Sequence, residues 1–241
     1  MGRTTSILWT KSTLNLAWGC TKVSTECDQC YMFRYSKRIG RDPERIQILT
    51  RGFENTLARI KPLQDLIFVN NMSDTFHIGM PFNILDEWFD AFEDFSVSKT
   101  FQILTKRPAI AIQYFKHRGS VPKNCWIGVS CGIERAKNRI DLLRQIDAKV
   151  RFVSFEPLLE DLRTLDLKGI HWAIIGGESD FKAPRPMNLD WVRNIIKQCR
   201  EQNVAVFFKQ VGGIGGDNAG GCLIDNQEIK EFPLLGVKTY E

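Results

Sequence analysis

The sequence predicts an α/β fold, a single-domain parallel (β/α) barrel of the TIM-like kind, either complete or partial. Short apolar runs rich in β-branched residues recur along the chain, and stretches with helical spacing lie between most of them. The runs are almost continuously apolar, as expected for parallel strands that are covered on both faces. A doubly wound open sheet is the alternative arrangement of the same elements.

The predicted elements follow one another in strand–helix order. The strands are a first one near residues 13–18, then 45–49, 66–70, 100–104, 125–130, 150–154, 172–176 and 204–208. The helices are 54–63, 83–95, 108–117, 133–146 and 189–202. Pro81, Pro108 and Asn188 lie where helices commonly begin. About eight parallel strands are enough for a barrel with right-handed crossovers.

The composition limits the class of protein. A chain of 241 residues with 43% hydrophobic content can bury a full core, and residues 1–241 are expected to form one domain. The net charge of +5 permits an anionic partner without requiring one. No apolar run is long enough to span a membrane, and the start does not resemble a signal peptide. Seven cysteines, an odd number, indicate reduced thiols, so we expect a cytoplasmic protein.

Polar residues follow each predicted strand. Because the carboxyl ends of parallel strands meet at one face, these residues are expected to ring a single cavity. The solvent exposure of loops explains any one of these polar residues, but not their occurrence after every predicted strand. The ring comprises Thr50, Arg51, Asn71, Ser73, Asp74, Thr105, Lys106, Arg107, Ser130, Ser154, Glu156, Gly176, Gly177, Glu178, Ser179, Lys209 and Gln210.

Three cysteines follow the first predicted strand. Cys20, Cys27 and Cys30 are spaced C-x6-C-x2-C in "WGCTKVSTECDQCY", and no fourth ligand follows nearby. His77 is the histidine that lies nearest to the predicted ring in sequence, although a hydrogen-bonded loop histidine is the simpler interpretation. Structural zinc sites normally take four ligands, whereas an iron–sulfur cluster held by three thiolates keeps one iron open. The cysteine spacing alone does not decide between zinc and an iron–sulfur cluster.

This cysteine motif resembles the DUF5131 family, also known as the phage Gp37/Gp68-type proteins, which are placed near the radical S-adenosylmethionine (SAM) enzymes. The resemblance continues through "IFVNNMSDTFH", "TFQILTKRP", "RFVSFEPLL", "WAIIGGES" and "FFKQVGG", and covers about residues 6–233. Radical SAM enzymes usually space their cysteines C-x3-C-x2-C, so the first gap is wider here. The resemblance implies a radical SAM-type barrel.

The resemblance also implies cofactors and residue roles. Cys20, Cys27 and Cys30 would hold a [4Fe-4S] cluster whose open iron binds SAM, and an electron donor would reduce it. The expected cofactor-binding residues are Tyr31, Asn71, Asp74, Gly176, Gly177 and Glu178, the last three by likeness to a motif that binds the SAM amino group. The expected catalytic residues are Lys106, Glu156 and Lys209. Relatives lie beside a three-Cys-motif partner protein in phages and mobile regions, which implies a nucleic-acid or nucleotide substrate.

Two alternative functions stay open. One is a cluster- or zinc-binding module that recognises nucleic acid without chemistry, which the basic and aromatic stretch 31–45 favours. The other is a different SAM- or nucleotide-dependent enzyme with structural zinc. The glycine-rich stretch 212–221 lacks the Lys-Ser/Thr of a phosphate loop, and a mobile lid is the preferred interpretation.

Overall fold

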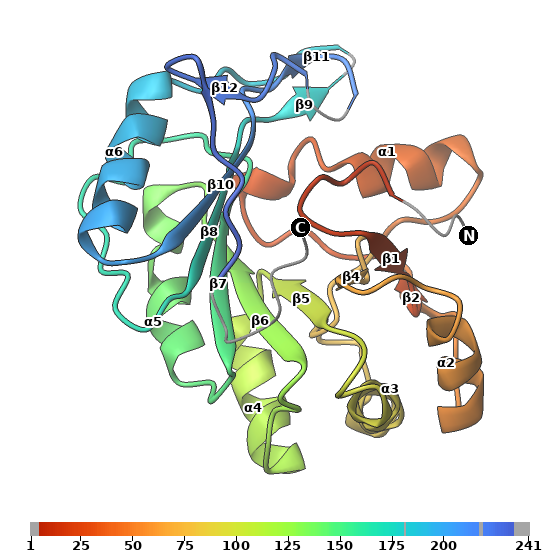
Figure 1. The fold of residues 1–241 in the computed structure, drawn as a ribbon. Helices are drawn as coiled ribbons and strands as arrows, with labels where there is room; N and C mark the ends of the chain where they lie inside the picture. The colour runs from red at the N-terminus through yellow and green to blue at the C-terminus, as the bar shows by residue number, and fades with distance from the viewer. Residues whose placement is uncertain (1–4, 181, 217–218, 234–241) are drawn as a thin grey trace.

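The computed structural model describes residues 5–180, 182–216 and 219–233 (Figure 1). Within these residues one parallel sheet of seven strands forms the centre of the molecule, in the order β1-β4-β5-β6-β7-β8-β10. The strands are β1 Ser12–Leu14, β4 Ile67–Val69, β5 Phe101–Thr105, β6 Cys125–Ser130, β7 Val150–Phe155, β8 Trp172–Gly176 and β10 Ala205–Gln210. The sheet curls into a half-barrel, so the predicted partial TIM-like barrel is confirmed and the doubly wound alternative is wrong.

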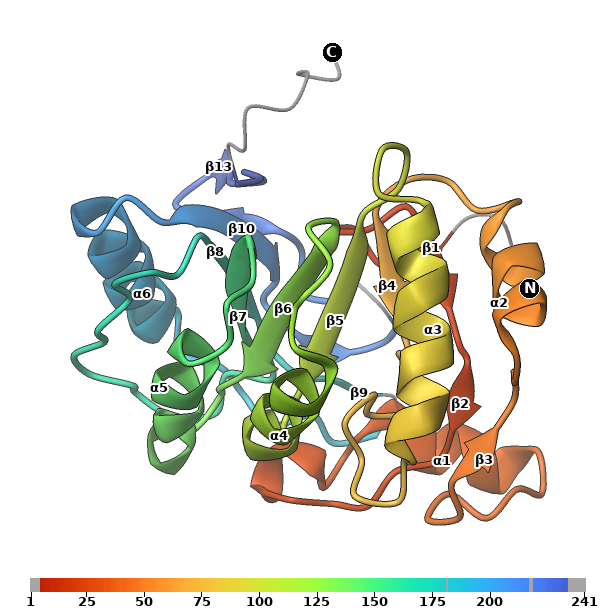
Figure 2. The same cartoon turned by 90° about the horizontal axis from the view of Figure 1, so that it is seen from below.

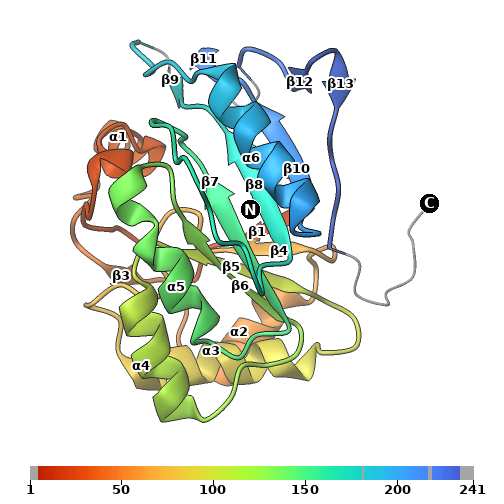
Figure 3. The ribbon, with the colours of Figure 1, turned by 90° about the vertical axis from the view of Figure 1, so that its left-hand side faces the viewer.

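The helices cover the convex face of the half-barrel (Figures 2 and 3). Their bounds are α2 Phe53–Ile60, α3 Phe82–Asp94, α4 Pro108–Arg118, α5 Asn138–Arg144 and α6 Leu189–Glu201. Local signals explain where they begin. The Asn188 side chain accepts a hydrogen bond from the Asp190 amide at the start of α6, and Pro108 occupies the first turn of α4. All five predicted helices are present.

Side chains alternate between two apolar clusters along each strand. Convex-face residues such as Ile103, Ile127 and Val153 pack under the helices in the larger cluster. Concave-face residues, among them Phe152 and Trp172, form a second cluster inside the half-barrel. The strands read as continuously apolar because both faces are buried.

The open side of the half-barrel is covered by two segments that are far apart in sequence. Trp9, in the segment before β1, packs on Phe68, with ring centroids 4.5 Å apart, and on Trp172, at 6.1 Å. Phe232 lies 5.2 Å from the Trp172 ring, and the Trp172 indole donates to the Glu231 carbonyl. These segments stand where a closed barrel would have further strands.

The structure corrects the predicted strand at 45–49. Only β3, Gln47–Ile48, is extended there, and it pairs antiparallel with β2, Ala17–Trp18, outside the main sheet. The strand predicted near 13–18 is therefore divided between β1 and β2. Thr50 and Arg51, which follow β3, do not line the cavity described below: the Thr50 carbonyl accepts from the Trp88 indole of α3. The apolar residues at 45–49 therefore belong to a two-strand ribbon and not to the main sheet.

Shorter elements decorate the carboxyl ends of the strands. They are the 3₁₀ turns Thr25–Cys27 and Glu134–Ala136, helix α1 Tyr31–Arg38, the parallel pair β9 Ser179–Asp180 and β11 Gly213–Ile214, and the hairpin β12 Leu223–Ile224 and β13 Gln227–Glu228. Figure 3 shows α1, β9 and β11 at the end to which β7 and β8 point. No helix among the described residues is long and apolar enough to cross a bilayer.

Candidate functional site

A cavity of about 530 Å³ lies where the parallel strands end. Its apolar wall includes Trp9, Phe68 and Leu104 from the concave cluster, and its rim is polar. The volume falls within the range of roughly 300–1,000 Å³ that is usual for small-molecule sites. The cavity is thus the mouth of the half-barrel.

Most of the predicted site residues line this one cavity. They come from the cysteine loop, from α1 and from the ends of β4, β5, β7, β8 and β10. They are Cys20, Cys27, Cys30, Tyr31, Asn71, Asp74, Lys106, Glu156, Gly177, Glu178 and Lys209. Gly176 lies behind the wall rather than in it. Their placement is a finding, while the roles assigned to them stay predictions.

The three cysteines reach the cavity from adjoining short elements. Cys20 follows β2, Cys27 ends a 3₁₀ turn and Cys30 precedes the first residue of α1. Burial, followed by the charge of Asp74, raises the pKa of Cys20 to about 12, and Cys27 and Cys30 contribute in the same direction. Burial also raises the pKa of Cys30, against the opposing charge of Lys106. The raised pKa values favour the neutral thiol form of Cys20 and Cys30.

The cysteine loop is held against the barrel by a buried ion pair. Glu26 lies between the cysteines with its side chain fully buried, and it accepts a hydrogen bond of 2.7 Å from Arg139 of α5. Its other oxygen accepts from the Gly132 amide at 2.7 Å, just past β6. Glu26 was not predicted as a site residue, because nothing in the local sequence distinguishes it from a solvated loop acid.

Two arginines provide further anchors for the same loop. Arg107, after β5, donates to the Thr21 carbonyl at 2.9 Å and to its hydroxyl at 2.7 Å. Arg185 donates to the Thr25 carbonyl at 2.8 Å. The cysteine loop is therefore held by contacts from α5, from the end of β5 and from the loop before α6.

His77 is part of this support and is not free to bind a metal. Its Nδ1 accepts from the Gly79 amide at 3.0 Å, so the proton of the neutral ring lies on Nε2, which is 2.9 Å from the Thr21 hydroxyl. Burial and the nearby charge of Arg107 lower its pKa. The simpler interpretation of His77, a hydrogen-bonded loop histidine, agrees with this geometry.

Residues after β4 connect the cavity wall to the neighbouring strand. The buried Asp74 carboxylate accepts from the Thr105 hydroxyl at 2.7 Å and from the Lys106 amide at 3.0 Å. The Tyr31 hydroxyl donates to the Asn71 carbonyl at 2.7 Å, and the Asn71 side chain accepts from Asn15. Asp74 thus fixes the backbone of Lys106, and its carboxylate is already satisfied by protein donors.

Two carboxylates on the opposite wall are paired. Glu156 Oε1 accepts from Lys209 Nζ at 2.6 Å and from Gln210 Nε2 at 2.9 Å. Glu178 binds the Arg185 guanidinium through both of its oxygens. Glu156 Oε2 and Lys106 Nζ, by contrast, have no hydrogen-bond partner or ion pair among the described residues. These two groups are the ones left available to a ligand.

Gly177 is required by the packing of β8 against the end of β10. A Cβ atom there would lie 1.9 Å from the Val211 carbonyl oxygen. At Gly176 the nearest atom would be the Gln210 amide nitrogen at 3.0 Å. The two glycines bring the chain ends together, whatever else they contact. In the stretch 212–221, residues 217–218 lie outside the described residues, and Gly215 and Gly216 line the cavity.

The candidate metal ligands in the cavity are three thiols, the ligand type of iron–sulfur clusters. No three His, Cys, Asp or Glu side chains within the described ranges are arranged to hold one metal ion. A [4Fe-4S] cluster makes a different demand, since each thiolate binds a different iron and the thiols need not meet at one point. Of the seven cysteines, only these three line the cavity as far as the structure describes it.

The fold and the cavity define a class, a partial (β/α) barrel with a thiol-lined mouth. The family model described as "Protein of unknown function (DUF5131)" matches residues 4–233. The chain therefore belongs to the DUF5131 family, as its motifs indicated. No curated protein and no solved structure matches it.

Proposed function

We propose that this protein is a radical SAM-like enzyme that holds a [4Fe-4S] cluster and SAM in the half-barrel cavity. The observation that carries the proposal is the placement of three cysteine thiols, and no fourth within the described residues, on the wall of one cavity. When bound, the cluster would supply one electron for reductive cleavage of SAM, giving a carbon radical that abstracts hydrogen from a substrate.

The chain's own residues would bind and shield the cofactors. Cys20, Cys27 and Cys30 would be the cluster ligands. Lys106, whose ammonium has no ion pair among the described residues, would bind the SAM carboxylate, while Glu156 Oε2 would accept from the SAM ammonium. The apolar wall of the cavity would exclude water from the reacting groups.

The pairing of Glu178 changes the role we propose for it. Because its carboxylate is bound by Arg185, and Arg185 also holds the Thr25 carbonyl, Glu178 would position the cysteine loop. Asp74 would act in the same way on Lys106. Tyr31, Asn71 and Gly177 would contact the nucleoside part of SAM from the rim.

The proposal is tested by anaerobic reconstitution with iron and sulfide. The wild-type protein is expected to bind about four irons and four sulfides per chain and, with SAM and dithionite, to release 5′-deoxyadenosine. Cys20→Ala, Cys27→Ala and Cys30→Ala should each lose both properties. Cys222→Ala is the matched control, because Cys222 is a half-buried thiol outside the cavity.

Two results would contradict the proposal. One is full iron and sulfide content in all three variants. The other is tight, stoichiometric zinc in the aerobically purified protein without any cleavage of SAM, which would favour the non-catalytic metal-binding module.

A further inference from the structure

The exposed face of α1 combines aromatic rings with basic side chains. The helix buries Met32 and Ser36 and exposes Tyr35, Lys37 and Arg38. We call the outward surface the α1 face; it comprises Trp18, Tyr35, Lys37, Arg38 and Arg41.

The rings and guanidinium groups of the α1 face form a row of neighbouring contacts, with the Trp18 and Tyr35 ring planes tilted by 42°. The Trp18 and Tyr35 rings lie 5.8 Å apart. Arg38 lies 4.7 Å from the centre of the Tyr35 ring, and Arg41 lies 4.9 Å from the Trp18 ring. The Trp18 indole is fixed by a 2.8 Å hydrogen bond to the Ser36 hydroxyl. The row is thus ordered before any partner binds, although Tyr35 remains 39% exposed.

The positive charges of this face are not balanced by carboxylates. Lys37, Arg38 and Arg41 form no ion pair with any described residue, whereas Arg118, Arg193 and Arg200 on the helices of the convex side all do. Five basic and two acidic side chains lie between Tyr31 and Arg45, a net charge of +3 against +5 for the whole chain. The excess positive charge of the protein is therefore concentrated beside α1.

The α1 face is continuous with the rim of the cavity. Tyr31, Phe33 and Arg34 of the same helix line the cavity, and Tyr31 is 46% exposed. The α1 helix lies beside the ends of β1 and β2 (Figure 1), so a chain bound along it would reach the edge of the cavity.

We propose that single-stranded nucleic acid docks on the α1 face, with its bases stacked on the rings and its phosphates against the guanidinium and ammonium groups. Aromatic rings interleaved with cations are the usual means of binding a single strand, because every base offers a flat face and every nucleotide a phosphate. The docking of nucleic acid on the α1 face does not depend on the proposed function. The further step, that this nucleic acid is the substrate of the cavity, rests on the proposed function.

The ordered rings favour a single strand as the partner over a duplex, an acidic peptide or an anionic bilayer. In a duplex the faces of the bases are covered by their neighbours, so Tyr35 would have nothing to stack on. An acidic peptide or an anionic bilayer would satisfy the charges but would leave the ordered rings without a partner.

Fluorescence anisotropy tests the proposal with three labelled probes: a 12-nucleotide DNA, the RNA of the same sequence and the DNA duplex. At least one of the two single strands should bind more tightly than the duplex. Tyr35→Leu, which keeps an apolar side chain, should weaken binding about tenfold through loss of base stacking. Arg38→Ala/Arg41→Ala should lower the slope of log K against log[KCl] by about 1.4, as expected for two lost phosphate contacts.

The matched control is Lys116→Ala/Lys197→Ala, which removes the same charge from exposed positions on α4 and α6 and should change neither quantity. Equal affinity of wild-type, Tyr35→Leu and the arginine variant would overturn the proposal. So would tighter binding of the duplex, of polyglutamate or of phosphatidylserine vesicles.

The binding assay is read separately from the SAM assay, with and without the reconstituted cluster. Oligonucleotide binding without SAM cleavage would leave the docking surface in place and remove the proposed enzyme activity. SAM cleavage without oligonucleotide binding would keep the enzyme and overturn the nucleic-acid substrate.

Discussion

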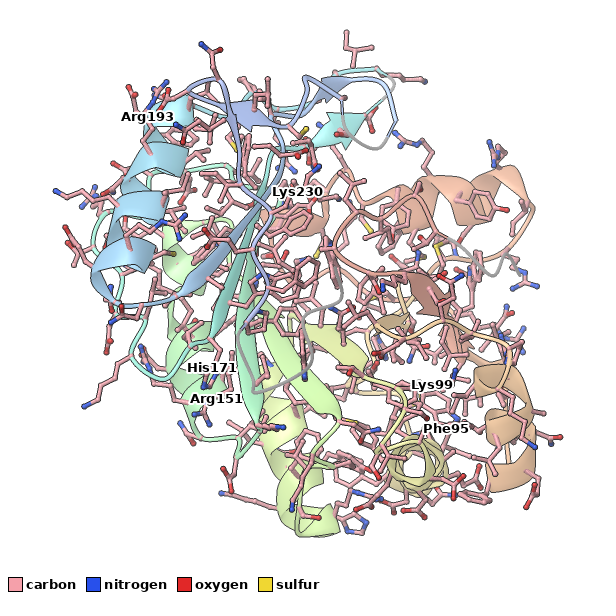
Figure 4. All side chains as sticks on the ribbon, viewed as in Figure 1. Phe95, Lys99, Arg151, His171, Arg193 and Lys230 are labelled. Atoms are coloured by element: carbon pink, nitrogen blue, oxygen red, sulfur yellow. The ribbon has the colours of Figure 1, made fainter. Side chains whose placement is uncertain are left out.

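His171 is a half-buried acceptor at the opposite end of the sheet from the cavity. It lies beside Arg151, near the amino ends of β7 and β8 (Figure 4). Its Nδ1 accepts from the Arg151 amide at 3.1 Å. Burial, and then the charge of Arg151, lower its pKa below the ordinary value of 6.5. The folded protein therefore keeps this ring neutral at a pH where the unfolded chain protonates it.

This difference makes stability depend on pH. As the pH falls below 6.5 the unfolded chain takes up the proton first, so the free energy of unfolding should fall until the folded-state pKa is passed. His171→Asn keeps an acceptor but cannot titrate. Urea unfolding at pH 7.5 and 5.5 should show a larger loss in the wild type than in His171→Asn; equal losses would contradict the assignment.

At the scale of elements, the attachment of the cysteine loop to α5 depends on Glu26 and Arg139. With Glu26 fully buried and Arg139 nearly so, removing one charge leaves the other without compensation. Glu26→Gln should lower the free energy of unfolding by about 3–5 kcal/mol. Chemical denaturation measures this loss.

The double variant Glu26→Gln/Arg139→Met is the control, because it removes both charges. It should recover a substantial part of the stability lost in Glu26→Gln. If the two variants are equally destabilised, the ion pair is not what holds the loop.

The sequence predicted the elements whose signals are local. Continuous apolar runs predicted the strands, helix-start residues such as Asn188 predicted the helices, and polar residues after each strand predicted the cavity wall. The strand at 45–49 was assigned to the wrong sheet because an apolar run says nothing about which strand is the partner or in which direction it runs. Glu26 was missed for a related reason, since Arg139 lies 113 residues further along the chain.

At the scale of the whole molecule, Trp9 closes the half-barrel. It is 3% exposed and contacts the rings of Phe68, Phe152 and Trp172, which belong to β4, β7 and β8. Its segment therefore covers the open side of the half-barrel, which hydrogen-bonded strands would cover in a closed barrel.

Trp9→Ala should lower the free energy of unfolding by about 3–5 kcal/mol, because it leaves a hole among rings from three strands. Trp9→Phe keeps a ring in place and should lose less. Denaturant unfolding of both variants measures the effect. Similar stability of Trp9→Ala and the wild type would show that the segment merely lies on the surface.

The order of the strands sets the order in which the cavity can be built during synthesis. From β4 to β10, each strand of the main sheet pairs with the main-sheet strand that precedes it along the chain. The sheet can therefore grow as the chain leaves the ribosome. The cysteine loop is among the first parts to emerge, whereas Lys209 and Gln210 of β10 and the covering segment 229–233 are among the last. Until β10 pairs with β8, the wall that carries Lys209 and Gln210 is missing, and the three thiols stay accessible from that side.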